Sequence, residues 1–265
     1  MSCAAERVRD PRTRRPALVL LVTWALAVVL GGCGTTDTTG GGRVLTVFAA
    51  ASLTDVFGEL ERRFEAEHPG VDVVVSSGGS ADLAQQVVNG APADVLVTAS
   101  RATMDVVVRE GLTEGTPRVL ATNVLQIAVP PDNPGRITTF ADLAREDVVV
   151  VVCAPAVPCG AAAKKAEQAF GVQLRPVSEE PDVRSVLGKV LAGEADAGLV
   201  YVTDVRTGAG KVLGVPLPDP EITRTSYPIT VIRGTPQPEL ARQFVEFTHG
   251  PAGRQVLEAA GFGVP

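Results

Sequence analysis

The sequence has few of the residues on which most catalytic and metal centres depend. Its 265 residues include 2 His, 4 Cys, 2 Tyr and 1 Trp. This leaves little material for a zinc cluster or a histidine-based catalytic centre. It also leaves too few ligands to coordinate iron directly, as an iron or metal-chelate receptor would.

Positive charge is scarce as well. The chain has 24 Lys and Arg against 30 Asp and Glu, a formal net charge of −6. A nucleic-acid partner requires a basic face, so this balance argues against one. A hydrophobic fraction of 45% and a charged fraction of 20% are ordinary for a globular protein. The length suffices for one or two domains with real cores.

Residues 1–32 have the pattern of a secretory signal peptide. Five arginines between positions 7 and 15 precede an apolar run from Ala17 to Leu30. The run is short for a bilayer span of about 20 residues but is typical of a signal-peptide core. It ends in Leu30-Gly-Gly-Cys33, which resembles the lipobox of bacterial lipoproteins, where the cysteine is lipidated and becomes the first mature residue. We therefore expect a lipid-anchored extracytoplasmic protein; the alternative is an uncleaved anchor helix.

Cleavage before Cys33 leaves a more acidic chain with a polar start. The mature part has 19 basic and 28 acidic residues, a formal charge of −9, and no tryptophan. Positions 34–42 contain no apolar side chain, so we assign residues 33–43 to a flexible tether.

Beyond the tether, short apolar runs alternate with stretches of helical spacing. Strands are predicted at 44–50, 71–76, 93–98, 123–129, 148–152, 197–201 and 227–232. Helices are predicted over 53–64, 83–88, 161–170, 183–191, 239–247 and 252–260. This order predicts an α/β fold of two lobes, each with a mostly parallel sheet covered by helices.

Four junctions that lead into predicted helices suit an anion site. Ser52 and Ser80 stand at two of them, and Pro158-Cys159-Gly160 and Asp182 stand at the others. In open α/β sheets such junctions face the crevice beyond the carboxyl ends of the strands. A helix N-terminus also offers unpaired N–H groups to an anion. For either serine alone, capping of its own helix is the simpler interpretation.

Cys153 and Cys159 flank the segment Ala-Pro-Ala-Val-Pro. They are the cysteines that remain when Cys3 leaves with the signal and Cys33 carries the lipid. In an oxidising compartment they suggest a disulfide. The alternative is two free thiols, because the two prolines can impose an unsuitable geometry.

No catalytic motif competes with a binding function. His68 precedes Pro69 and His249 precedes Gly250-Pro251, positions typical of turns, and neither lies near a nucleophile motif. Gly208-Ala-Gly-Lys211 lacks the first glycine and the Ser or Thr of a phosphate-binding loop. The sequence therefore argues against a hydrolase or transferase.

Six blocks in order carry a family resemblance. They are Thr46-Val-Phe-Ala-Ala-Ala-Ser-Leu-Thr-Asp55, Gly78-Gly-Ser-Ala-Asp-Leu-Ala-Gln-Gln86, Gly90-Ala-Pro-Ala-Asp-Val95, Val157-Pro-Cys-Gly160, Pro181-Asp-Val-Arg184 and Gly198-Leu-Val-Tyr-Val-Thr203. Together they resemble the molybdate-binding proteins, the extracytoplasmic receptors of molybdate ABC importers. The resemblance covers essentially the whole mature chain.

The resemblance implies a two-lobed periplasmic-binding-protein fold of type II, with two mixed, mostly parallel sheets, helices on both faces and two hinge crossings. We expect lobe 1 to combine residues 44–122 with 226–265, and lobe 2 to span 123–225. It implies a monomeric binding protein that is not an enzyme and has no cofactor. Such a protein captures molybdate and tungstate and delivers them to the permease subunits of an importer. The alternative is a receptor for sulfate or another tetrahedral oxyanion.

The resemblance also implies five ligand contacts. Ser52 and Ser80 would donate through hydroxyl and backbone groups, Cys159 and Val183 through backbone N–H groups, and Tyr201 through its phenol. All are uncharged donors, as a buried dianion that only accepts hydrogen bonds requires. The metal would thus be held as its oxyanion, without direct metal ligands. Cys159 departs from the family pattern, where alanine is common, and a bridge to Cys153 could shift its amide.

Overall fold

The structure, a computed structural model, describes residues 43–265. The predicted signal peptide, Cys33 and the tether up to residue 42 lie outside the described residues. The described chain forms two five-stranded sheets, ordered β2-β1-β3-β10-β4 and β7-β6-β8-β5-β9. These sheets define lobe 1 and lobe 2, and they confirm the predicted two-lobed α/β class. Each sheet has two parallel and two antiparallel pairings, so parallel pairing is less dominant than expected.

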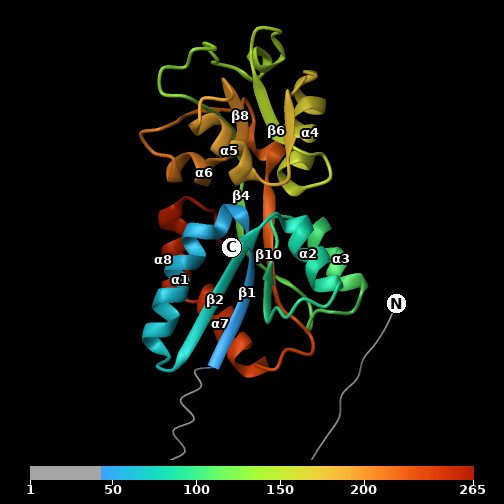
Figure 1. Cartoon of the computed structure of the whole chain (residues 1–265), viewed down its shortest axis with the longest axis vertical. Coiled ribbons are helices and arrows are strands. Elements are labelled where there is room, and N and C mark those ends of the chain that lie inside the picture. Colours follow the sequence, from blue (N-terminus) through green and yellow to red (C-terminus); the bar gives the residue numbers. More distant parts are fainter. Residues whose placement is uncertain (1–42) are drawn as a thin grey trace, which may run out of the picture. The chain divides into compact units, whose positions relative to one another are not determined.

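Lobe 1 combines the first third of the described chain with its end. Its elements are β1 (Arg43–Ala50), η1 (Ala51–Leu53), α1 (Thr54–Glu67), β2 (Val71–Gly78), α2 (Ser80–Val88), β3 (Val95–Val97), α3 (Arg101–Arg109), β4 (Arg118–Asn123), β10 (Thr225–Val231), α7 (Pro238–His249) and α8 (Pro251–Ala260). Because side chains alternate along a strand, β1 serves both faces of the sheet. Leu45 and Val47 pack with α1, α7 and α8, whereas Phe48 packs with α2 and α3, which lie on the opposite side in Figure 1.

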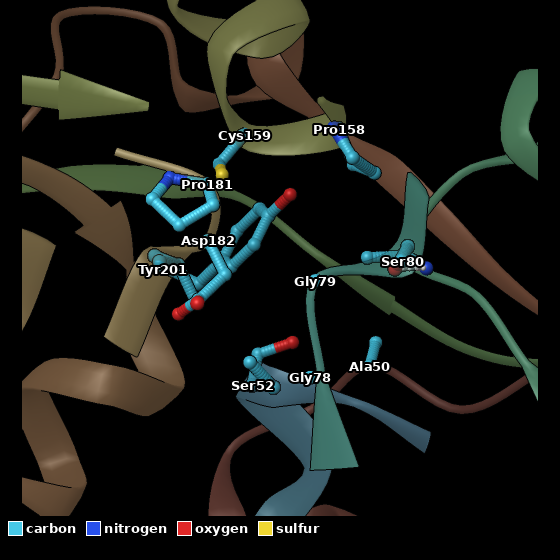
Figure 2. Close-up of a pocket in the computed structure, with 13 residues that line it drawn as sticks. Ala50, Ser52, Gly78, Gly79, Ser80, Pro158, Cys159, Pro181, Asp182 and Tyr201 are labelled. Carbon is cyan, nitrogen blue, oxygen red and sulfur yellow. Dashed lines mark hydrogen bonds between the residues drawn. The ribbon is translucent and has the colours of Figure 1, made fainter. Parts of the chain in front are cut away.

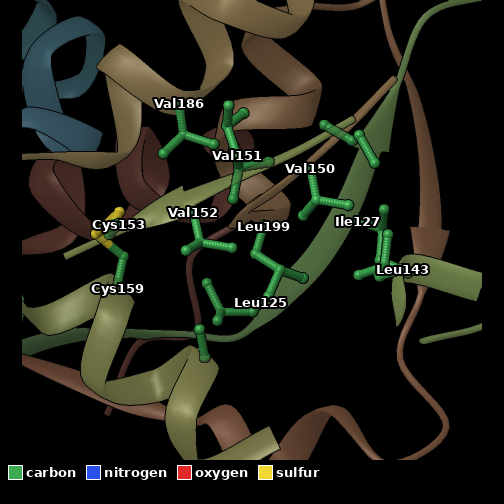
Figure 3. Packing of buried hydrophobic residues seen from close by; sticks show 14 of the residues in the cluster. Leu125, Ile127, Leu143, Val150, Val151, Val152, Cys153, Cys159, Val186 and Leu199 are labelled. Carbon is green, nitrogen blue, oxygen red and sulfur yellow. A yellow bond between two sulfur atoms is a disulfide. The ribbon is translucent and has the colours of Figure 1, made fainter. Parts of the chain in front are cut away.

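Lobe 2 is built from the middle of the chain. Its elements are β5 (Leu125–Val129), η2 (Phe140–Ala144), β6 (Val150–Cys153), α4 (Pro158–Phe170), β7 (Ser178–Glu180), α5 (Val183–Leu191), β8 (Ala197–Tyr201), α6 (Val202–Thr207), β9 (Leu213–Pro216) and η3 (Pro220–Thr223). All four residues of β6 are buried, as expected for a strand covered on both faces. Figure 3 shows Val150, Val151 and Val152 packed among Leu125, Leu199 and other side chains of one continuous core.

The chain passes between the lobes at two neighbouring places. β4 ends at Asn123 and β5 begins at Leu125, while η3 ends at Thr223 and β10 begins at Thr225 (Figure 1). The Leu125 N–H donates to Thr223 Oγ1 at 2.9 Å. Asn123 Nδ2 donates to Thr203 Oγ1 of lobe 2 at 2.8 Å. Buried hydrogen bonds therefore hold the crossing segments together. The residue boundaries given above for the lobes stay a prediction.

The disulfide expected between Cys153 and Cys159 is present, with Cα atoms 5.6 Å apart (Figure 3). It joins the end of β6 to the first turn of α4. Pro158 does not prevent it, because it occupies the first position of α4, where the missing N–H of proline removes no helical hydrogen bond. Within residues 43–265, no helix is long and apolar enough to cross a membrane.

Candidate functional site

The five residues predicted as ligand contacts line one small pocket between the lobes. Ser52 and Ser80 come from lobe 1, and Cys159, Val183 and Tyr201 come from lobe 2. Figure 2 shows Ser52, Ser80, Cys159 and Tyr201 bordering the same space. The cavity volume is about 20 Å³. This size suits a small inorganic ion. That the five residues bind a ligand stays a prediction.

Three α-helix starts surround the pocket with N–H groups that their own helices do not use. In α2 the first helical hydrogen bond is donated by the Leu83 N–H, and in α4 by the Ala161 N–H. The N–H groups of Ser80 and Cys159 come earlier in these helices, so neither takes part in a helical hydrogen bond. In α5 the side chain of Asp182 accepts from the N–H groups of Arg184 and Ser185, which leaves that of Val183. Unpaired N–H groups at helix starts attract an anion through their partial positive charge.

The two serines do not cap their helices, contrary to the simpler interpretation of each. Ser52 lies inside η1, and α1 begins only at Thr54. Ser80 is the first residue of α2, and the N-cap position belongs to Gly79. The Ser80 Oγ instead accepts from the Ala99 N–H at 2.9 Å, and the Ser52 Oγ lies 2.9 Å from the hydroxyl of Tyr227. Both serines are only 4% exposed.

Tyr201 presents a buried hydroxyl without a hydrogen-bond partner. The side chain is 1% exposed and lines the pocket. Burial raises the pKa of this phenol well above its ordinary value, and the neighbouring Tyr227 and Asp204 raise the pKa further. The group is therefore a neutral donor. A buried donor left unpaired costs about 1–3 kcal/mol, which an oxygen of a bound anion would recover.

The pocket lining contains no lysine, arginine or histidine. Its one charged residue is Asp182, whose carboxylate already accepts from the N–H groups of Arg184 and Ser185 and from the Ser185 hydroxyl. Small residues let the backbones approach: a Cβ on Gly79 of lobe 1 would lie 2.9 Å from the Pro181 carbonyl of lobe 2. No group of acidic, histidine or cysteine residues suited to a metal occurs among the described residues.

A charged cluster lies beside the pocket; sequence reasoning did not identify it. We call Asp55, Arg184, Asp204 and Thr207 the ion cluster. Arg184 of lobe 2 donates to Asp55 of lobe 1 at 2.5 Å, and Thr207 Oγ1 lies 3.3 Å from the same carboxylate. The Arg184 Nε lies 3.2 Å from Asp204 Oδ1, close enough for an ion pair but without hydrogen-bond geometry.

Asp204 also supports Tyr201. Its Oδ2 accepts from the Tyr201 N–H at 3.0 Å at the start of α6. Asp204 is fully buried. Burial raises the pKa of its carboxyl to about 7, although the nearby Arg184 and the bond from the Tyr201 N–H act in the opposite direction. The spacing of three residues between Tyr201 and Asp204 was a signal for this role in the sequence.

Comparisons with known proteins agree with this geometry. Residues 45–263 match the family described as bacterial extracellular solute-binding protein. The chain is 44% identical, over 252 residues, to the molybdate-binding protein ModA of Mycobacterium tuberculosis; the match covers 92% of this chain and 97% of that protein.

Two solved structures share the fold. The periplasmic molybdate-binding protein of Azotobacter vinelandii has a TM-score of 0.73 at 23% identity, over 83% of this chain and 99% of that one. The sulfate-binding protein SubI of Mycobacterium tuberculosis has a TM-score of 0.71 at 21% identity, over 83% and 86% of the two chains. The fold alone therefore does not distinguish a molybdate site from a sulfate site.

Proposed function

The chain belongs to the bacterial extracellular solute-binding proteins, and from this premise we propose that it captures molybdate for an ABC importer. One observation carries the proposal: Ser52, Ser80, Cys159, Val183 and Tyr201, all sources of uncharged donors, line the same pocket between the lobes. The 44% identity to a molybdate-binding protein over nearly the whole chain supports molybdate as the ligand.

The chemistry of the pocket suits a fully deprotonated oxyanion. Molybdate is a tetrahedral dianion with acceptors only, so burying it is favourable only when donors surround its oxygens. A hydrogen bond to a charged group contributes about 1.5–3 kcal/mol. Tungstate has the same charge and shape, and we propose it as a second ligand. Phosphate that carries a proton also needs an acceptor, and none of the five proposed contacts is a carboxylate.

The arrangement of donors also suggests how binding is signalled. Because lobes 1 and 2 each supply donors, a bound anion favours the closed state over an open one. We propose that the permease subunits recognise this closed form. The lipid on Cys33 would keep the receptor, as a monomer, at the outer surface of the membrane. The net charge of the mature chain repels anions at long range, so capture depends on the local donors.

Isothermal titration of the mature protein with molybdate, tungstate, sulfate and hydrogen phosphate tests the proposal. We expect sub-micromolar dissociation constants for molybdate and tungstate and much weaker binding of the other two anions. Sub-micromolar binding of sulfate would instead assign the protein to the sulfate receptors.

A further inference from the structure

Both pocket serines have a hydrogen-bond partner within lobe 1. The Ala99 N–H donates to Ser80 Oγ at 2.9 Å, and the Tyr227 hydroxyl lies 2.9 Å from Ser52 Oγ. A serine hydroxyl has one proton to donate. When its oxygen already accepts a hydrogen bond from a protein donor, that proton stays free for a ligand.

The direction of the bond between Tyr227 and Ser52 follows from the surroundings of Tyr227. Its side chain is fully buried, and burial raises the pKa of the phenol above its ordinary value, so the hydroxyl keeps its proton. The neighbouring Asn123 is already engaged: its Nδ2 donates to Thr203, and its Oδ1 accepts from the Val124 N–H. The Tyr201 ring also packs against Tyr227, but the Tyr201 hydroxyl has no hydrogen-bond partner. Ser52 Oγ, at 2.9 Å, is therefore the acceptor that keeps the Tyr227 proton from being buried unpaired.

We propose that Tyr227 is a positioning residue that fixes the Ser52 hydroxyl as a donor, as the Ala99 amide does for Ser80. The inference rests on the proposed function and extends it to selectivity. With one lone pair of each serine oxygen occupied, the hydroxyl proton is the group that each serine turns to the ligand, which favours an oxyanion without a proton over hydrogen phosphate. A fully deprotonated oxyanion loses nothing by this restriction.

The ring of Tyr227 is held independently of its hydroxyl. It packs edge-on against Phe262, with centroids 5.4 Å apart, and against Tyr201 at 6.1 Å. Tyr227→Phe therefore removes the donor to Ser52 and keeps the packing. The Ser52 hydroxyl can then rotate and accept as well as donate.

A double-mutant cycle on the mature protein tests the inference, with Tyr227→Phe combined in turn with Ser52→Ala and Ser80→Ala. Titration with molybdate should show binding about fivefold to tenfold weaker for Tyr227→Phe, the effect of one lost hydrogen bond. The ratio of hydrogen phosphate to molybdate affinity should rise. In the Ser52→Ala background, Tyr227→Phe should cause no further loss. In the matched Ser80→Ala background it should cause the full loss.

Three results would overturn the inference. These are unchanged molybdate affinity in Tyr227→Phe, an equal loss in both serine backgrounds, and a Tyr227→Phe protein that does not fold by thermal melting. The proposed function is tested separately by the wild type. If the wild type binds sulfate and not molybdate, that function fails, yet the same cycle with sulfate still decides the role of Tyr227. Binding of none of the four anions would overturn both.

Discussion

Two polar regions lie between the lobes, and they differ in whether their polar groups pair with each other across the lobes. In the pocket, donors of both lobes face a common space, and the Tyr201 hydroxyl has no partner. In the ion cluster, Arg184 of lobe 2 meets the carboxylate of Asp55 of lobe 1 directly. The ion cluster therefore links the lobes directly, whereas the pocket donors would link them only through the anion that we propose binds there.

The two carboxylates of the ion cluster differ in burial. The Asp55 side chain is 59% exposed and that of Asp204 is fully buried, with Arg184 between them at 26%. Exposed ion pairs contribute about 0–1 kcal/mol, whereas removal of one partner from a buried pair costs several kcal/mol. Removal of the two carboxylates should thus change stability by very different amounts. Four predictions test this difference and the difference between the ion cluster and the pocket.

The largest effect should come from Asp204→Ala. It removes the acceptor for the Tyr201 N–H and the buried partner of Arg184. We expect the free energy of unfolding, measured by chemical denaturation, to fall by about 3 kcal/mol. Asp204→Asn is the control, because it keeps the size and one acceptor, and it should lose less. A loss no greater than that of Asp55→Ala would contradict the contrast.

The second effect is a pH dependence confined to the ion cluster. The folded-state pKa of Asp204 is about 7, above its ordinary value of 3.8, so the folded protein binds this proton more tightly than the unfolded chain. The resulting stability is fully present below pH 3.8 and is lost as the pH rises through 7. Between pH 5 and pH 8, the stability of the wild type relative to Asp204→Asn should fall by about 2.5 kcal/mol.

The pocket provides the comparison for this pH series. The Tyr201 phenol keeps its proton because its pKa is raised well above the ordinary value, and the other proposed donors do not titrate. Molybdate affinity should therefore change little between pH 6 and pH 8 in Asp204→Asn. A steep change in that variant would show that a further titrating group acts on the pocket.

The third prediction concerns the pocket alone. Tyr201→Phe removes the unpaired donor and should weaken molybdate binding by about 1–2 kcal/mol, roughly tenfold. The free protein should be as stable as the wild type or slightly more stable, because the lost hydroxyl has no partner without a ligand. Calorimetric titration and thermal melting measure the two quantities. Unchanged affinity would place Tyr201 outside the binding contacts.

The smallest effect is expected for Asp55→Asn. It weakens the contact with Arg184 between the lobes and should reduce stability by less than about 1 kcal/mol. Molybdate affinity should fall about twofold to threefold, since the closed state loses a contact. Glu59→Gln is the matched control, because Glu59 also lies on α1 but pairs with Arg62 and Arg63 of its own helix. Equal changes of affinity in the two variants would show that Asp55 does not act through the closed state.

The sequence predicted which residues meet at the site better than it predicted their hydrogen bonds. The order of the six blocks was enough to predict the residues that line the pocket. The partners of the two serines were not predictable, because Tyr227 is 175 residues from Ser52 and Ala99 is 19 residues from Ser80. The burial of Asp204 likewise depends on how α5 and α6 pack.

Elements with little buried surface were also missed. Helix α3 buries only Met104 and Val107, too few to form a recognisable helical pattern, although its N-cap Ser100 was a usable signal. Strand β9 lies at a sheet edge with no fully buried residue and ends in Pro216. Central strands such as β6, buried throughout, were predicted because a short apolar run rich in β-branched valine is typical of a fully buried strand.

The disulfide between Cys153 and Cys159 has a consequence for how the receptor matures. It fastens the α4 turn that carries one of the proposed amide donors to the end of β6. Thiols of an extracellular protein are oxidised after export, so this wall of the anion cradle reaches its final form by a redox reaction outside the cytoplasm. Completion of the pocket therefore depends on export, because this disulfide forms only after the chain has left the cytoplasm.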